Sequence, residues 1–237
     1  MPKTDLPTLV LVNGAWHRTN MWNDLIERLP SDLDVRTVQL PSSAPVNPTQ
    51  LGDLYDDAAA IRAAVQAVDG PVVVMPHSYG GAPATQGLVG LPNLRRIVYL
   101  CAFQLDVGES VLSSLGGERP PFWGPKYAEH GFYEILDAEH VFFPDVDPAK
   151  AAEVAATLGP QSVAAMNQPL TQAAWRTVPS TYIHAEKDVH PERFRQFSLR
   201  SDRVIPIQSA HSPFLSQPAE LAAIVTTELK DAADTDR

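Results

Sequence analysis

The chain has 237 residues, which is enough for one domain of the larger sort with a full hydrophobic core. Hydrophobic residues make up 44% and charged residues 19%, an ordinary globular balance that excludes wholesale disorder. The formal net charge of −10 disfavours partners that need a basic face, so we expect neither a nucleic-acid nor a membrane partner.

The first half of the chain alternates strand patterns with helical patterns. Strands are expected at residues 8–13, 34–40, 71–75 and 94–103, and helices at residues 21–29, 53–68 and 80–89. The run 71–75 is continuously apolar, which is typical of a central strand buried on both faces. This alternation predicts a parallel sheet with right-handed crossovers.

The alternation breaks between residues 105 and 175. This stretch contains proline-rich turns and two short helical patterns, near residues 150–158 and 161–166, but no clear strand. Strands resume at residues 180–186 and 203–208, with a helix opened by Pro191 between them and a final helix from about residue 218 to 230. We therefore expect a core formed by residues 1–104 and 176–237, and a helical lid formed by residues 105–175.

The N-terminus runs almost at once into a strand and lacks the apolar region of a signal peptide. No apolar stretch approaches the length of a membrane span, so the expected location is the cytoplasm. Cys101 is the single cysteine and can form no internal disulfide; its apolar setting indicates a buried strand thiol.

The strongest local signal is the segment VVVMPHSYGGA, residues 72–82, in which a buried strand ends, Ser78 follows, and Gly80 and Gly81 open a helix. A sharp turn of this kind lifts a serine above the sheet edge and holds it beside a base. The segment predicts Ser78 as a nucleophile, against the plainer alternative of a serine that caps an ordinary helix. Pro76 stands where the usual G-x-S-x-G pattern has its first glycine.

The segment LVLVNGAWH, residues 9–17, is the second signal, because the loop after this strand reaches the serine turn. The backbone amides of Ala15 and Tyr79 are expected to face one oxyanion, which is the largest electrostatic contribution in acyl transfer. Expected substrate contacts are Gly14, Trp16, His17, Trp123 and Phe214.

Asp188 and His211 each follow a late strand, where the active sites of open α/β sheets lie. The order Ser, Asp, His along the chain predicts His211 as general base and Asp188 as the acid that orients it. Asp106, at the end of an earlier strand, is the rival acid, and His77 is expected to pack away from Ser78. No metal is expected, because the remaining histidines lack the spacing of metal ligands: His130, His140, His184 and His190. No cofactor is expected either.

With these residues identified, the chain resembles small α/β-hydrolases of the plant methylesterase and hydroxynitrile lyase type, and their bacterial esterase relatives. The matching segments span nearly the whole chain: LVLVNGAWH, PHSYGGA, CAFQLDVGES, PSTYIHAEKD and SAHSPFLSQP. The resemblance implies an α/β-hydrolase fold with Asp188 and His211 at the acid and base positions. The family has a histidine where Asn13 stands, and its lyases have a threonine in place of Gly14 and a lysine in place of Ser212, so the esterase branch fits better.

Residues and resemblance together predict a cofactor-free carboxylic ester hydrolase that forms an acyl-enzyme on Ser78. Aromatic residues concentrate in the expected lid, which favours a small to medium ester or lactone with an apolar or aromatic part. The alternatives are a lyase, a cofactor-independent oxygenase with His211 as base, and a slow ligand-binding pseudoenzyme. The sequence leaves open whether the protein is a monomer or a homodimer.

Overall fold

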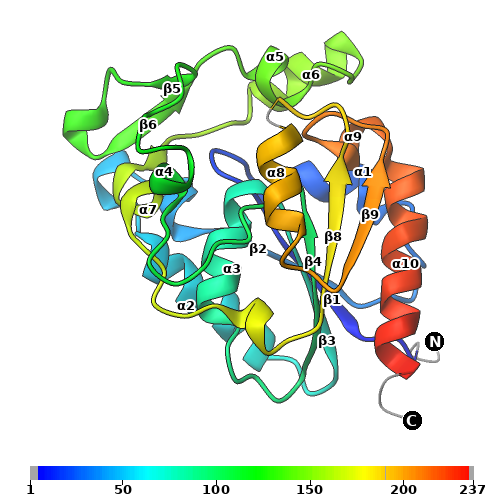
Figure 1. Cartoon of the computed structure of the whole chain (residues 1–237). Helices are drawn as coiled ribbons and strands as arrows, with labels where there is room; N and C mark the ends of the chain where they lie inside the picture. Colours follow the sequence, from blue (N-terminus) through cyan, green and yellow to red (C-terminus); the bar gives the residue numbers. More distant parts are fainter. Residues whose placement is uncertain (1–4, 190, 235–237) are drawn as a thin grey trace.

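The computed structural model describes residues 5–189 and 191–234, and a six-stranded sheet runs through its centre (Figure 1). The strands, in spatial order, are β2 (Val35–Val38), β1 (Thr8–Val12), β3 (Val72–Pro76), β4 (Leu94–Leu100), β8 (Ser180–Ala185) and β9 (Arg203–Ile207). Every neighbouring pair in this order is parallel. The predicted parallel sheet is therefore confirmed; β3 has the expected length, shifted by one residue, and each other strand is one to three residues shorter than its sequence pattern.

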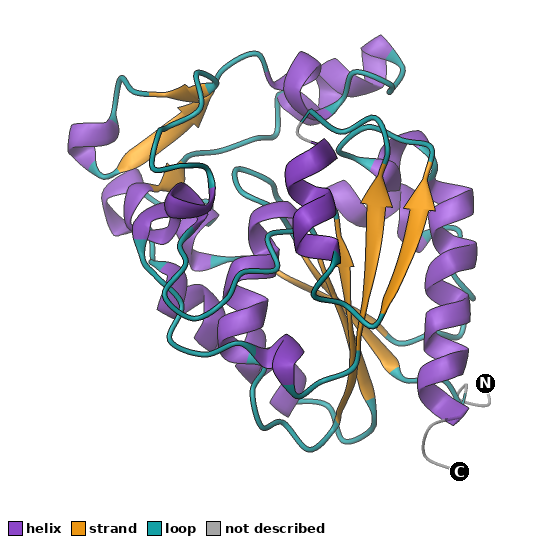
Figure 2. Ribbon diagram, in the orientation of Figure 1, coloured by secondary structure: helices purple, strands orange, loops and turns teal. Residues whose placement is uncertain are grey.

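Helices cover both faces of this sheet, as Figure 2 shows. Successive strand side chains point to opposite faces, so Val10 and Val74 pack on one side while Leu11 and Met75 pack on the other. The first side is covered by α2 (Leu54–Gln66), α3 (Gly81–Gly87) and α8 (Pro191–Ser198), and the second by α1 (Asn23–Ile26), α9 (Pro213–Ser216) and α10 (Pro218–Asp234). Short 3-10 turns connect these elements: η1 (Thr19–Trp22), η2 (Pro41–Ser43), η3 (Pro48–Gln50) and η4 (Ser78–Gly80).

The segment between β4 and β8, residues 105–175, differs from its prediction because it contains strands. Its elements are α4 (Val111–Ser114), β5 (Trp123–Gly124), η5 (Ala128–His130), β6 (Phe132–Ile135), α5 (Ala138–Phe142), α6 (Pro148–Ala155), β7 (Gln161–Ser162), α7 (Val163–Asn167) and η6 (Ala174–Arg176). The three strands form a small antiparallel sheet in the order β5-β6-β7. The expectation of helices and turns without strands was wrong, because strands of two to four residues are too short to show an alternating pattern. We call residues 105–175 the inserted segment.

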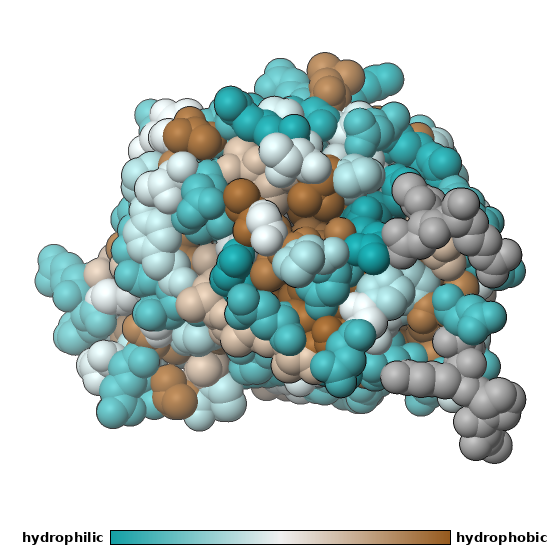
Figure 3. Space-filling view, turned by 90° about the horizontal axis from the view of Figure 1, so that it is seen from below, coloured by the Kyte–Doolittle hydropathy of each residue, from teal (hydrophilic) through white to brown (hydrophobic). Residues whose placement is uncertain are grey.

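The carboxyl ends of the parallel strands lie at the top of Figure 1, on the side of the molecule that carries the inserted segment. The opposite end, seen from below in Figure 3, carries polar residues with apolar ones scattered among them. The predicted functional residues follow the carboxyl ends of strands and therefore belong to the edge of the sheet that faces the inserted segment.

In the part of the chain that the structure describes, none of the helices has both the length and the apolarity that a membrane crossing requires.

Candidate active site

Ser78, Asp188 and His211 form one hydrogen-bonded chain at this edge. His211 Nε2 lies 2.9 Å from Ser78 Oγ, and His211 Nδ1 lies 2.7 Å from Asp188 Oδ2. The three residues follow β3, β8 and β9, and all three are buried. A neutral imidazole in this position can accept the proton of the serine hydroxyl, while the carboxylate fixes the proton on the other ring nitrogen. The structure thus brings together the three residues that the sequence singled out.

The turn that carries Ser78 is strained and tightly packed. Ser78 has φ of 52°, in the left-handed region that non-glycine residues rarely adopt. A Cβ at Gly80 would lie 2.6 Å from the Asn13 carbonyl oxygen, and one at Gly81 would lie 2.8 Å from the Phe103 carbonyl oxygen. Only glycine fits at these two positions, so the sequence of the turn is dictated by close backbone approach.

His77 does more than pack beside this turn. Its Nε2 lies 2.9 Å from the His211 carbonyl oxygen, which can only accept, so the ring carries its proton on Nε2. Burial holds the pKa of His77 well below the ordinary histidine value, which keeps the ring neutral. The strand β3 ends at Pro76, which has no backbone N–H to donate. The next residue, His77, donates its backbone amide to the Val12 carbonyl at 2.9 Å, so the chain stays hydrogen-bonded to β1 beyond the proline.

The loop after β1 is held against the serine turn by Asn13 and Gly14. Asn13 Nδ2 donates to the carbonyl oxygens of Gly14, at 3.2 Å, and of His17, at 2.9 Å. A Cβ at Gly14 would lie 3.0 Å from both Ser78 Cβ and His77 Nδ1. Asn13 therefore supplies the hydrogen bonds that fold this loop, and Gly14 permits its close approach to Ser78.

Ala15 and Tyr79, whose amides are the predicted oxyanion donors, line the same cavity as Ser78. The next amide along the loop, that of Trp16, donates to Gln161 Oε1 at 3.3 Å and is thereby engaged in the protein. This contact leaves Ala15 as the candidate donor on the loop. The function of the two amides remains a prediction.

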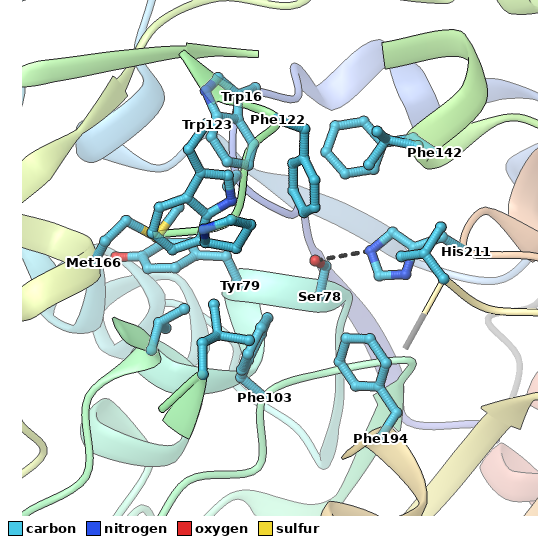
Figure 4. Close-up of a pocket in the computed structure, with 16 residues that line it drawn as sticks. Trp16, Ser78, Tyr79, Phe103, Phe122, Trp123, Phe142, Met166, Phe194 and His211 are labelled. Atoms are coloured by element: carbon cyan, nitrogen blue, oxygen red, sulfur yellow. Dashed lines mark hydrogen bonds between the residues drawn. The ribbon is translucent and has the colours of Figure 1, made fainter. Parts of the chain in front are cut away.

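The cavity beside Ser78 is small, about 40 Å³, and apolar. Figure 4 shows Trp16, Tyr79, Trp123 and Met166 on one side of Ser78, with His211 on the other. Its described lining contains no Asp, Glu, Lys or Arg and consists of Ala15, Trp16, Ser78, Tyr79, Phe103, Val111, Leu115, Pro120, Phe122, Trp123, Val141, Phe142, Met166, Val189, Phe194 and His211. Trp16 and Trp123 line this cavity, and their contact with a substrate stays a prediction.

The other three expected substrate contacts do not line this cavity. Gly14 lies in the loop after β1, where its missing side chain makes room for Ser78. His17 turns back so that its Nδ1 lies 2.8 Å from the Ala15 carbonyl oxygen, and burial lowers its pKa to about 4. Phe214 is fully buried and packs on Trp22, with ring centroids 5.0 Å apart, so both aromatic rings stabilise the layer behind the site.

The inserted segment contacts the base as well as the cavity. The Phe142 ring lies stacked on the His211 ring, with centroids 5.7 Å apart and an interplanar angle of 28°. Asp145 Oδ2 accepts a hydrogen bond of 2.7 Å from the amide of Ala210, the residue before His211. The conformation of the base is therefore coupled to the inserted segment.

The competing sequence candidates lie elsewhere. Asp106 Oδ2 accepts a 2.7 Å bond from Arg176 instead of approaching His211. Cys101 is fully buried, and burial raises the pKa of its thiol. Across residues 5–189 and 191–234, no three His, Cys, Asp or Glu side chains are grouped so that they could hold a metal ion, and His190 lies outside these residues.

Sequence reasoning missed a buried carboxyl beside the site, that of Asp57. It is 0% exposed, and it accepts hydrogen bonds from the Tyr79 hydroxyl at 2.7 Å and the Ser42 amide at 2.8 Å. Burial raises the pKa of Asp57 to about 7. The signal for it was present: the residue lies three positions after Leu54 and four before Ile61, on the apolar stripe of α2.

We expect Asp57→Asn to change how stability depends on pH. The folded-state pKa of about 7 exceeds the unfolded value of 3.8, so the folded chain binds this proton more tightly. Asp57 therefore lowers the free energy of unfolding as pH rises from about 4 to about 7, by up to about 4 kcal/mol. Urea unfolding of both proteins at pH 5 and pH 8 should show the asparagine variant gaining stability over wild type at the higher pH.

Asp69→Asn is the matched control, because Asp69 is an exposed aspartate in the loop after α2. This variant should follow the wild-type dependence on pH. A constant stability difference between Asp57→Asn and wild type at both pH values would contradict the raised pKa.

Comparisons with known proteins agree with this fold. A profile described as the alpha/beta hydrolase family matches residues 9–224. The chain is 30% identical over 251 residues to an alpha/beta hydrolase of Aspergillus novofumigatus, with 96% of this chain and 98% of that protein covered. It is 25% identical over 241 residues to a carbendazim hydrolyzing esterase of Nocardioides sp., with 92% and 97% covered. A pyrethroid hydrolase structure has a TM-score of 0.80 at 18% identity, covering 96% of this chain and 98% of that chain, which confirms the predicted fold.

Proposed function

Because the chain belongs to the alpha/beta hydrolase family, we propose that it is a serine esterase that cleaves carboxylic esters or lactones through an acyl-enzyme on Ser78. The observation that carries this proposal is the continuous hydrogen-bonded chain from Ser78 through His211 to Asp188, with distances of 2.9 and 2.7 Å. The carbendazim hydrolyzing esterase of similar sequence supports ester hydrolysis over other reactions of this fold.

In the proposed mechanism, His211 Nε2 accepts the proton as Ser78 Oγ attacks the carbonyl carbon of the ester. Asp188 holds the proton on His211 Nδ1 and stabilises the imidazolium that forms. His211 then gives the proton to the departing alcohol, and a water molecule hydrolyses the acyl-enzyme by the same steps in reverse order. The Ala15 and Tyr79 amides bind the oxyanion of both tetrahedral intermediates.

The proposed substrate is neutral and largely apolar. The cavity has no charged lining residue among those described, so it offers no counterion to an anionic substrate. Half of its lining comes from the inserted segment, at Val111, Leu115, Pro120, Phe122, Trp123, Val141, Phe142 and Met166. We propose that residues 105–175 act as the lid that covers the substrate over the core of residues 1–104 and 176–237.

We expect kcat/KM to rise along a series of p-nitrophenyl esters from acetate to butyrate to hexanoate. Each methylene buried in an apolar cavity contributes about 0.8 kcal/mol, which corresponds to about a fourfold gain. A steady fall along the series would contradict an apolar acyl site.

Leu115→Trp tests whether the gain depends on this cavity, because Leu115 lines it and is only partly buried. Added bulk at this position should flatten the ester series. Leu199→Trp is the matched control, because Leu199 is 80% exposed outside the cavity, and this variant should keep the wild-type trend.

A further inference from the structure

A chain of buried hydrogen bonds joins the loop after β1 to the turn after β3. The Trp16 amide donates to Gln161 Oε1 at 3.3 Å, and Gln161 Nε2 donates to Ser42 Oγ at 2.9 Å. The Ser42 amide donates to Asp57 Oδ1 at 2.8 Å, and the Tyr79 hydroxyl donates to Asp57 Oδ2 at 2.7 Å. None of these five residues is more than 3% exposed, so water does not compete for their bonds.

The loop end of this chain holds a strained residue. Trp16 has φ of 63°, a conformation that costs a non-glycine residue free energy unless its surroundings enforce it. Its amide bonds to Gln161, its carbonyl oxygen accepts from the Gly159 amide at 2.9 Å, and its indole Nε1 donates to the Tyr133 carbonyl at 3.1 Å. All three partners belong to the inserted segment, which therefore enforces the shape of the loop.

At the turn after β3, the hydrogen-bonded chain ends in the buried carboxyl of Asp57, which accepts from the Tyr79 hydroxyl. Burying an ionisable group disfavours its charged form, and this raises the pKa of Asp57 to about 7. Burial and the nearby Asp57 carboxyl raise the pKa of Tyr79 well above its ordinary value, so its hydroxyl keeps the proton that it donates. Asp57 lies on α2 and Ser42 on η2, which ties the serine turn to two rigid elements of the core.

We propose that Asp57, Ser42 and Gln161 are positioning residues that hold the backbone amides of Ala15 and Tyr79 at a fixed separation. This inference rests on the proposed esterase mechanism, in which those two amides bind the oxyanion. Such donors must lie 2.7–3.1 Å from the oxyanion, and a displacement of about 1 Å can lower the rate by about a hundredfold.

The ends of the buried chain are placed to have this effect. Trp16 follows Ala15 directly, and Tyr79 contributes its own amide, so a shift at either end moves a donor. Figure 4 shows Trp16 and Tyr79 on the same side of Ser78, away from His211. Loss of the chain should therefore affect oxyanion binding while leaving the hydrogen bonds between Ser78, His211 and Asp188 in place.

Tyr79→Phe and Gln161→Leu test the proposal, because the first removes one hydrogen bond of the chain and the second removes two, while an apolar side chain stays in each place. With p-nitrophenyl butyrate, we expect kcat to fall about tenfold to a hundredfold while KM stays within about twofold. The inhibition constant of a trifluoromethyl ketone, whose adduct with Ser78 carries an oxyanion, should rise by the same factor as kcat falls.

Matched controls exist for both variants in the same core. Tyr99 is a buried tyrosine whose hydroxyl lies 2.8 Å from Thr85 Oγ1, and Gln86 is a buried glutamine that accepts from the Thr171 amide at 2.8 Å. Tyr99→Phe and Gln86→Leu should lower Tm about as much as the test variants do, but should keep the wild-type kcat and inhibition constant.

The positioning role is overturned if Tyr79→Phe and Gln161→Leu keep the wild-type kcat and inhibition constant, whatever happens to Tm. Labelling of the wild-type protein by a fluorophosphonate probe tests separately the proposed esterase mechanism, on which the positioning role depends. If the wild-type protein neither reacts with the probe at Ser78 nor cleaves any ester of the series, the esterase mechanism itself fails, and the positioning role fails with it.

Discussion

Replacing Ser78 by alanine is expected to lower kcat/KM for p-nitrophenyl butyrate by about 10⁵-fold and to abolish labelling by a fluorophosphonate probe. The alanine removes the only atom that forms the acyl-enzyme, and the residual rate comes from substrate binding and the oxyanion donors alone. The side chain becomes smaller in a turn already constrained by Gly80 and Gly81, so the thermal unfolding curve should stay close to that of wild type. Steady-state kinetics, intact-protein mass spectrometry after labelling, and Tm measure the three effects.

Ser212→Ala is the control for this substitution. Ser212 is fully buried next to His211, and its hydroxyl has no hydrogen-bond partner among the described residues. Its loss should leave turnover and labelling at wild-type levels. If Ser78→Ala kept more than a tenth of the wild-type activity, acyl-enzyme chemistry on Ser78 would be the wrong mechanism.

Asp188→Asn is expected to lower kcat by about 10³-fold to 10⁴-fold with little change in KM. The carboxylate lies 2.7 Å from His211 Nδ1 and fixes a proton there, which leaves Nε2 free to accept the serine proton. An amide in this position can present its NH₂ group to Nδ1 and stabilise the wrong tautomer. The wild-type and variant rates, measured over the same range of ester concentrations, give the two constants.

Asp106→Asn provides the comparison. It makes the same replacement of a carboxylate by an amide, at a residue that follows the neighbouring strand β4. Asp106 pairs with Arg176 near the surface, and an exposed ion pair contributes at most about 1 kcal/mol to stability. Its activity should stay within about twofold of wild type. A larger loss of activity at Asp106 than at Asp188 would show that Asp106, and not Asp188, is the orienting acid.

The sheet was predictable because its strands are long apolar runs between turn residues. The run 71–75 is uniformly apolar and becomes β3, and the run 203–208 becomes β9 at the edge. The segment 21–29 was predicted as one helix, but it divides into η1 and α1, because local spacing does not specify where a short helix begins. The strands of the inserted segment could not be predicted, since each is defined by its partner strand and not by its own pattern.

The residues of the site could be predicted where they directly follow the carboxyl end of a strand. Ser78, Asp188 and His211 follow strands whose carboxyl ends meet at one edge, so their proximity followed from the topology. Gln161 contacts the Trp16 amide across 145 positions of sequence, and no local pattern links the two. Asp57 was within reach of sequence reasoning, because it lies on the apolar stripe of α2 between Leu54 and Ile61.

The close approach of Gly14 to His77 limits how the proposed ester hydrolysis could be converted into a lyase reaction in this fold. The lyases that this chain resembles have a threonine in place of Gly14 and a lysine in place of Ser212. A Cβ at position 14 would lie 3.0 Å from His77 Nδ1, which is tighter than nine in ten Cβ contacts in proteins. The same Cβ would lie 3.0 Å from Ser78 Cβ, so grafting those two residues alone would require the loop or the serine turn to shift by a few tenths of an ångström.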